Sequence, residues 1–253
     1  MASIIWRLVE DANTYDVIFT ALFLQSWRIT EDHKVISGGV TIHTARLRLA
    51  QATIRSPEEA QAAVAAMQSG LETAIRDVTT AEPDHLLIGV SALSFLNGLA
   101  GRQRFEEFLA KITAVPVTTA AAAATAALQL YDVKKLALLS PHPAMMDEHY
   151  MRFFTEAGYH VARLHRIDCP TTLAIAMVDE ATIRAALRDL CDANADAVVQ
   201  LGTDLIMAEL SDEAERWLGK PVLAINAAML WHALRARGIE DRVLGFGSIL
   251  REH

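Results

Sequence analysis

The chain has only two cysteines in 253 residues, Cys169 and Cys191, which is too few for a disulfide framework or a four-cysteine zinc site. Positive charge is also scarce: 23 Lys and Arg stand against 31 Asp and Glu. Nucleic acids and anionic membranes need clustered basic residues. No apolar run reaches the roughly 18 residues of a membrane span, and residues 1–10 lack the features of a secretory signal. We therefore expect a cytoplasmic protein that binds a small molecule, with no nucleic-acid or membrane partner.

Glycine-rich phosphate loops are missing as well. Gly89-Val-Ser and Gly202-Thr-Asp hold too few glycines at the spacing that nucleotide-binding fingerprints require. A metal site built from His142 with Glu10 or Asp11 has no spacing motif behind it. We expect no cofactor and no metal.

What the chain does have is a pattern that occurs twice. The segment Asp84-His-Leu-Leu-Ile-Gly-Val-Ser91 leads from an acid through an apolar run to a hydroxyl, and Asp196-Ala-Val-Val-Gln-Leu-Gly-Thr203 does the same. Each copy is followed by an apolar run entered through proline and then by an alanine-rich segment. The pattern predicts one α/β unit used twice. Ser91 and Thr203 would then end equivalent strands and face a shared cleft, because parallel sheets bind ligands at the carboxyl ends of their strands.

Apolar periodicity along the chain predicts alternating strands and helices, and therefore parallel sheets with helices on both faces. We expect two α/β domains related by a pseudo-twofold axis: residues 1–118 with about 227–253, and about 119–226. The expected strands are 4–9, 40–49, the runs before Ser91 and Thr203, the two runs entered through proline, 135–139 and 161–164. The expected helices are about 15–27, 57–79 with Ser56 as its N-cap, 103–112, 120–130, 147–158 and 180–194.

Several segments resemble one known family in a common order. The segment Gly89-Val-Ser-Ala-Leu-Ser-Phe-Leu-Asn-Gly98 is similar to the first active-site loop of arylmalonate decarboxylases, and residues 42–49 resemble a stretch of maleate cis-trans isomerases. Asn13, residues 136–141, 214–222 and 245–250 extend the match over nearly the whole chain. The resemblance points to the aspartate/glutamate racemase superfamily. It implies two similar α/β domains with a small substrate held between them.

The chain departs from that family at its thiols. The racemases and isomerases of the family carry a pair of cysteines at the two repeat loops, and the decarboxylase keeps the second one. The resemblance places Val90 at the first position and Gly202 at the second. A thiolate can move a proton at carbon or attack an alkene, and valine and glycine can do neither. The family's thiol chemistry is therefore not expected here. Cys169 lies in a loop near the expected cleft and is an alternative thiol.

Hydroxyl and amide groups remain that could bind a carboxylate. Ser91 and Thr203 should begin helices, where backbone N–H groups attract anions, although the same hydroxyls could simply cap those helices. The resemblance gives Asn13 a substrate contact, and it places His142 where the family has a tyrosine that binds the substrate carboxylate. The full set of predicted substrate-binding residues is Asn13, Val90, Ser91, Ala92, Thr118, Thr171, Gly202 and Thr203.

Three carboxylates and one histidine are the candidates for moving a proton: Glu10, Asp11, Asp204 and His142. A carboxyl in the cleft would have its pKa raised by desolvation or by a neighbouring charge, which suits a general acid or base. The alternative for Glu10 and Asp11 is a solvated loop or a helix cap.

The sequence thus predicts a cysteine-independent enzyme that acts on a small carboxylic acid, as an isomerase, decarboxylase or other lyase, through an enediolate-like intermediate. One alternative is a carboxylate-binding protein without catalysis. Another is a hydrolase with Ser91 as nucleophile and His142 as base. A homo-oligomer is compatible with the sequence. The substrate and the stereochemistry are left open.

Overall fold

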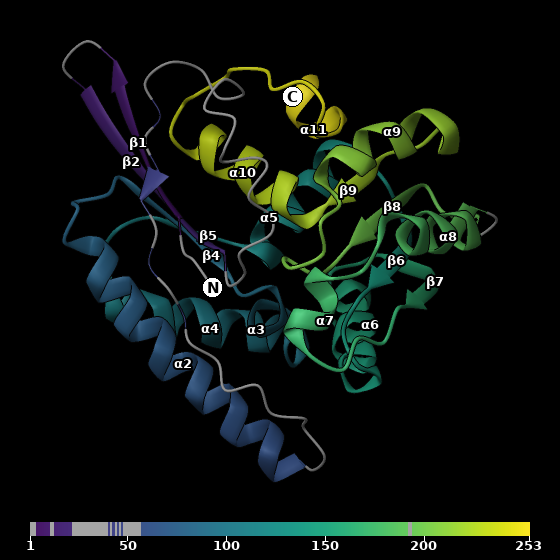
Figure 1. The fold of residues 1–253 in the computed structure, drawn as a ribbon, viewed down its shortest axis with the longest axis horizontal. Helices are drawn as coiled ribbons and strands as arrows, with labels where there is room; N and C mark the ends of the chain where they lie inside the picture. Colours follow the sequence, from purple (N-terminus) through teal and green to yellow (C-terminus); the bar gives the residue numbers. More distant parts are fainter. Residues whose placement is uncertain are drawn as a thin grey trace.

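The computed structural model describes residues 4–10, 13–21, 40, 42–43, 45, 47, 57–191 and 194–253, and it arranges them in two sheets with helices around them (Figure 1). The strands are β1 (Ile4–Glu10), β2 (Asn13–Ala21), β3 (Ile42–His43), β4 (His85–Gly89), β5 (Val117–Thr119), β6 (Lys135–Ser140), β7 (His160–Arg166), β8 (Ala197–Gln200) and β9 (Val222–Ala224). The helices are α2 (Pro57–Thr79), α3 (Ser91–Phe95), α4 (Gly98–Ile112), α5 (Ala120–Leu130), α6 (Asp147–Glu156), α7 (Thr172–Ala176), α8 (Glu180–Cys191), α9 (Ala208–Leu218), α10 (Ile225–Ala236) and α11 (Ser248–Arg251), with a 3-10 turn η1 (Ala144–Met146).

The first sheet has the strand order β3-β1-β2-β4-β5, and β1 runs antiparallel to both of its neighbours. The predicted α/β fold with parallel sheets is confirmed, since β2, β4 and β5 run parallel, and β1 is an antiparallel exception that the sequence did not predict. The predicted helix over 15–27 is wrong over residues 15–21, which belong to β2, and its remainder lies outside the described residues. Val17, Ile18, Phe19 and Thr20 are β-branched or aromatic and favour an extended chain, and β2 pairs with β1 on one side and β4 on the other.

The second sheet has the order β7-β6-β8-β9 and is parallel throughout, as predicted. The helices α2 and α5 confirm their predicted bounds. Helix α4 begins five residues earlier than predicted, because Asn97 adopts a left-handed conformation (φ 59°) and α4 starts directly after it at Gly98. Of the predicted strand over 40–49, the described residues form only β3.

Alternating strand residues divide the apolar core. In β4, Leu86 and Ile88 pack with α2 and α4, whereas Leu87 faces a central core shared with the second sheet. In β6, Leu136 and Leu138 face that same central core, whereas Ala137 and Leu139 pack with α8 and α9. Each sheet thus has one face on the central core and one face under its own helices.

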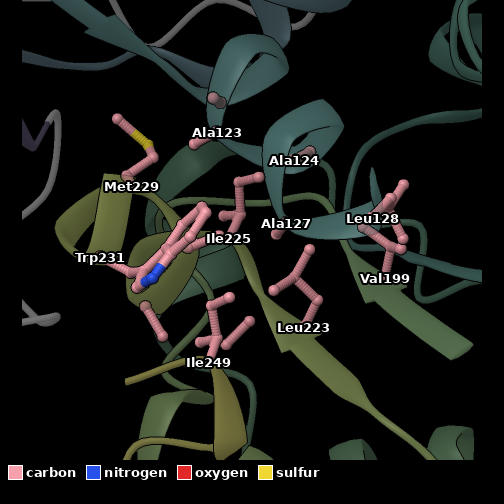
Figure 2. Packing of buried hydrophobic residues seen from close by; sticks show 14 of the residues in the cluster. Ala123, Ala124, Ala127, Leu128, Val199, Leu223, Ile225, Met229, Trp231 and Ile249 are labelled. Carbon is pink, nitrogen blue, oxygen red and sulfur yellow. The ribbon is translucent and has the colours of Figure 1, made fainter. Parts of the chain in front are cut away.

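The central core contains the helices α5 and α10, which pack against each other (Figure 2). Ala123, Ala124 and Ala127 on α5 are fully buried there, and the figure shows them beside Ile225 and Met229 of α10. Small side chains let the two helix backbones approach closely, which explains the alanine-rich segment after the first repeat copy. Helix α10 also contacts β4 and β5 of the first sheet and β9 of the second. The division of the chain near residues 118 and 226 stays a prediction.

Candidate functional site

The two repeat copies meet at the carboxyl ends of β4 and β8. The hydroxyl of Thr203 donates a hydrogen bond to the carbonyl of Gly89 at 2.8 Å, and both residues are buried. A turn follows β8, closed by a bond from the Leu205 N–H to the Gly202 carbonyl at 3.1 Å. Asn226 at the start of α10 donates its Nδ2 to the Thr203 carbonyl at 2.9 Å and holds that turn from the other side. We call the ends of β4, β6 and β8 with the loops that follow them the strand-end site.

Asp204 lies inside this turn and is 5% exposed. Its Oδ1 is fully buried and has no hydrogen-bond partner within the described part of the chain. Burial without a compensating donor disfavours the charged form, and it raises the pKa of the Asp204 carboxyl well above its usual range. Asp204 is therefore a carboxyl group held toward its protonated form, at the end of a central strand.

His142 follows β6 at the same edge and is half-buried. Its Nδ1 lies 2.8 Å from the hydroxyl of Tyr150 on α6, and its backbone N–H donates to the Ser140 hydroxyl at 3.2 Å. Desolvation lowers the pKa of His142 to about 4, so its ring is uncharged at neutral pH. His142 and Asp204 are the two predicted catalytic residues that the structure places at this edge.

The first repeat loop supplies a hydroxyl rather than a reactive side chain. Ser91 begins α3, is buried, and makes no side-chain hydrogen bond within the described residues. Ala92 is the next residue of that helix and is half-buried. Val90 packs into the apolar cluster with Leu93 beneath α2 and α4. Of the predicted binding residues in this loop, Ser91 is therefore the one whose polar group remains free for a ligand.

The ring of Pro141 fills the space that a side chain at Gly202 would occupy. A Cβ atom added at Gly202 would lie 2.2 Å from Cγ and 2.9 Å from Cδ of the proline ring, closer than real Cβ contacts. Position 202 is where the resemblance predicts a thiol. The contact supplies a physical reason why glycine is needed there in this chain.

We expect Gly202→Cys to destabilise the protein by about 1–3 kcal/mol, because overpacking forces a stiff ring and the backbone apart. Pro141→Ala in the same chain should recover most of that loss. Urea unfolding of the two variants measures it. Val90→Cys, the matched change at the other expected thiol position, replaces one apolar side chain by a smaller one and should cost less. A Gly202→Cys protein as stable as the parent would contradict the steric argument.

Other predicted residues have different partners or lie elsewhere. The Thr171 hydroxyl accepts the Ala174 N–H at 3.1 Å and caps α7. Cys169 is buried in the apolar cluster beneath α8, and burial raises the pKa of its thiol, with Asp168 adding to the rise. A thiol in that state is a poor proton carrier. Cys169 is therefore a weak replacement for the family's cysteines.

The N-terminal candidates are placed by the register of β2. Ala21 of β2 pairs with Gly89, at the carboxyl end of β4. Asn13 is eight positions earlier in β2 and pairs with Glu10 of β1, which puts both backbones about 26 Å along the strand from Gly89 at about 3.3 Å per residue. Asp11 and the side chains of Glu10 and Asn13 lie outside the described residues. The backbones of Glu10 and Asn13 are therefore distant from the strand-end site, and the role of Asp11 stays a prediction.

Thr118 takes part in a buried polar chain that the sequence argument missed. Its hydroxyl lies 2.8 Å from Nε2 of His85 and 2.9 Å from Nδ1 of His232. Burial lowers the pKa of His85 to about 3, helped by the charges of Arg237 and His232. The signal in the sequence is a histidine inside an apolar strand, His85 in the first repeat copy. Because its hydroxyl has two histidine partners, we read Thr118 as structural.

The shift at His85 predicts acid sensitivity. Its folded-state pKa is depressed below the ordinary 6.5. Between pH 6.5 and 3 the unfolded chain therefore binds a proton at His85 and the folded chain does not. Stability should fall across that window, by at most about 1.4 kcal/mol per pH unit, or about 2–3 kcal/mol by pH 4.5. Urea unfolding at several pH values measures it. His85→Gln should flatten the profile, whereas the exposed-site change His160→Gln should not. An unaltered profile in His85→Gln would refute the assignment.

Two features are absent from the described residues. No helix there is long and apolar enough to cross a membrane. No three His, Cys, Asp or Glu side chains among them gather in a way that could hold a metal ion.

The fold and the site define a class: an α/β protein whose two sheets bring a buried carboxyl, a neutral histidine and a free serine to neighbouring strand ends. The model of the arylmalonate decarboxylase family matches residues 47–250. The chain therefore belongs to the arylmalonate decarboxylase family.

Curated relatives agree with that assignment. The maleate isomerase of Pseudomonas putida is 27% identical over 217 residues, 83% of this chain and 84% of the relative. The arylmalonate decarboxylase of Bordetella bronchiseptica is 28% identical over 158 residues, 60% of this chain and 64% of the relative.

Solved structures give the same fold. A liganded double mutant of arylmalonate decarboxylase superposes with a TM-score of 0.76 at 20% identity, covering 92% of this chain and 97% of that one. The maleate isomerase Iso of Pseudomonas putida S16 superposes with a TM-score of 0.74 at 18% identity, covering 90% and 92%.

Proposed function

We propose that this protein is an enzyme that acts on a small carboxylic acid and delivers a proton to the carbon beside its carboxylate, as a decarboxylase or isomerase without a catalytic cysteine. Family membership supports the class of reaction, since the relatives are named maleate isomerase and arylmalonate decarboxylase. Among these reactions we favour decarboxylation. The observation that carries the proposal is the buried carboxyl of Asp204 after β8, whose Oδ1 has no hydrogen-bond partner among the described residues.

Asp204 is suited to give a proton rather than to take one. Because burial raises its pKa, the resting side chain is protonated over a wider pH range than an exposed aspartate. Isomerisation by proton abstraction would need the ionised form first. Isomerisation through addition of a nucleophile to an alkene would need a thiolate, and Val90 and Gly202 occupy the two expected thiol positions.

Uncharged donors would hold the substrate anion. The Ser91 hydroxyl is free among the described residues, and the neutral ring of His142 lies at the end of the neighbouring strand β6. Such donors stabilise charge that develops on a carboxylate oxygen as an enediolate forms. They do so without a full positive charge that would also bind the ground state tightly.

The proposed decarboxylation has three steps. The bond between the α-carbon and one carboxyl carbon breaks, carbon dioxide leaves, and the electron pair moves into the remaining carboxylate to form an enediolate. Asp204 then donates its proton to the α-carbon. The resulting Asp204 carboxylate recovers a proton from water. No metal, oxidant or reductant enters the balance.

Turnover of a substrate panel in D₂O tests the proposal. The panel contains 2-substituted malonic acids, maleate and ester controls, and NMR follows both product and solvent-derived label. We expect loss of carbon dioxide from a malonic acid with one deuterium placed on the α-carbon. Thermal shifts with these acids but no product at any pH would instead identify a binding protein. Ester cleavage alone would identify a hydrolase, although Ser91 and His142 make no hydrogen bond to each other within the described residues.

A further inference from the structure

We infer that Tyr150 is a positioning residue of the strand-end site: it donates its hydroxyl proton to Nδ1 of His142, and so fixes His142 as a donor through Nε2. The inference deepens the proposed function, since it gives His142 the role of substrate donor and excludes the role of base. Tyr150 lies on α6, eight residues after His142, and no sequence motif marked it.

The direction of the hydrogen bond follows from burial. The Tyr150 hydroxyl is 2.8 Å from His142 Nδ1 and has no other partner within the described residues. The residue is 0% exposed, and its ring packs edge-on against Phe95 with centroids 5.5 Å apart. Desolvation raises the pKa of Tyr150, with the charge of Asp147 adding to the rise, so the hydroxyl keeps its proton. A buried hydroxyl proton needs an acceptor, and Nδ1 is the one at hand.

The consequence for His142 is a single tautomer. A neutral imidazole has one N–H and one acceptor nitrogen, and the acceptor is now Nδ1. The remaining proton is on Nε2, on the side of the ring away from Tyr150. The bond from the His142 backbone to Ser140, together with Pro141 packed on Gly202, holds the loop that carries His142 beside the Asp204 turn.

An Nε2–H donor suits one part of the proposed reaction. It can donate a hydrogen bond to a carboxylate oxygen of the substrate and stabilise the negative charge that develops there. It cannot accept the proton of the Ser91 hydroxyl at that nitrogen. The Nε2–H tautomer therefore fits His142 as a donor to the substrate carboxylate, and it does not fit His142 as the base of a hydrolase.

The test reads the tautomer directly. ¹⁵N NMR of the histidine ring in the full-length protein should show wild-type His142 with its proton on Nε2 and an unprotonated, hydrogen-bonded Nδ1. In Tyr150→Phe the Nδ1 signal should move, and a population with the proton on Nδ1 should appear. Malonate affinity should fall about fivefold, the equivalent of one ordinary hydrogen bond of about 1 kcal/mol. Phenylalanine keeps the aromatic packing, so the fold should survive.

Tyr159→Phe is the matched control. Its ring also packs edge-on against a phenylalanine of α6, Phe154, with centroids 6.3 Å apart, and its loss should leave the His142 signals and malonate affinity unchanged. A wild-type ring protonated on Nδ1, or an identical His142 spectrum in Tyr150→Phe, would overturn the inference. If malonate fails to bind the wild type while the tautomer responds as expected, the proposed function fails and the positioning contact stands.

Discussion

Asp204→Asn should lower kcat on the decarboxylation substrate by about 10²–10⁴-fold, the range ascribed to one general acid or base. Asparagine has nearly the shape of the protonated carboxyl, and it cannot deliver a proton to carbon. Initial rates and deuterium incorporation, both measured under saturating substrate, report the loss. The KM should change little, because the substrate anion is held by Ser91 and His142.

The same variant should be more stable than the parent at neutral pH. Burial raises the pKa of Asp204 above the ordinary 3.8. Above that pH the unfolded chain is therefore stabilised by ionising a carboxyl that the folded chain keeps protonated. Asparagine removes this penalty, and the gain in stability should grow as the pH rises. Asp132→Asn, an exposed position with φ 50° that asparagine tolerates, should change neither rate nor stability. If Asp204→Asn keeps most of its activity, Asp204 is not the proton donor.

The parts of this fold that were predictable rest on local signals. The helix over 57–79 has proline at its first position, and the helix over 120–130 follows a threonine whose hydroxyl caps it at 3.3 Å from the Ala122 N–H. The doubled pattern located Asp204 and Ser91 because a repeat is visible without any knowledge of contacts. The strand β2 was missed because its pairing with β1 and β4 outweighed a helix-like apolar spacing.

The rest of the site depends on contacts between distant segments. Tyr150 follows His142 on a helix that presents many other side chains, and only the folded chain shows which one reaches the ring. The steric closure of Gly202 by Pro141 joins loops sixty-one positions apart. Tertiary pairs of this kind carry no periodicity, so sequence patterns identified the loops and not the partners within them.

Two segments that supported the family resemblance, residues 214–222 and 245–250, meet through Glu215. Its carboxylate accepts the Ser248 N–H and the Ser248 hydroxyl, both at 2.7 Å, and the Val222 N–H at 3.2 Å. Arg251 lies 3.6 Å from the same carboxylate. The Ser248 hydroxyl also lies 2.6 Å from the hydroxyl of Tyr131 at the end of α5. The side chain of Glu215 is 9% exposed, so these contacts are made away from solvent and tie α9, β9 and the C-terminal segment together.

Glu215→Ala should therefore lower the free energy of unfolding by about 3–5 kcal/mol, because it leaves two buried backbone N–H groups without their acceptor. Arg251 loses one nearby carboxylate and keeps its pairs with Asp212 and Glu252. Glu215→Gln should cost less, since its amide oxygen can still accept one of these bonds. Urea unfolding with an unchanged m-value measures both. Glu213→Ala is the matched control on the same helix: Glu213 pairs with Arg184 at 2.7 Å with its side chain 44% exposed, and an exposed pair is worth at most about 1 kcal/mol. Equal losses for Glu213→Ala and Glu215→Ala would show that burial gives the Glu215 network no added strength.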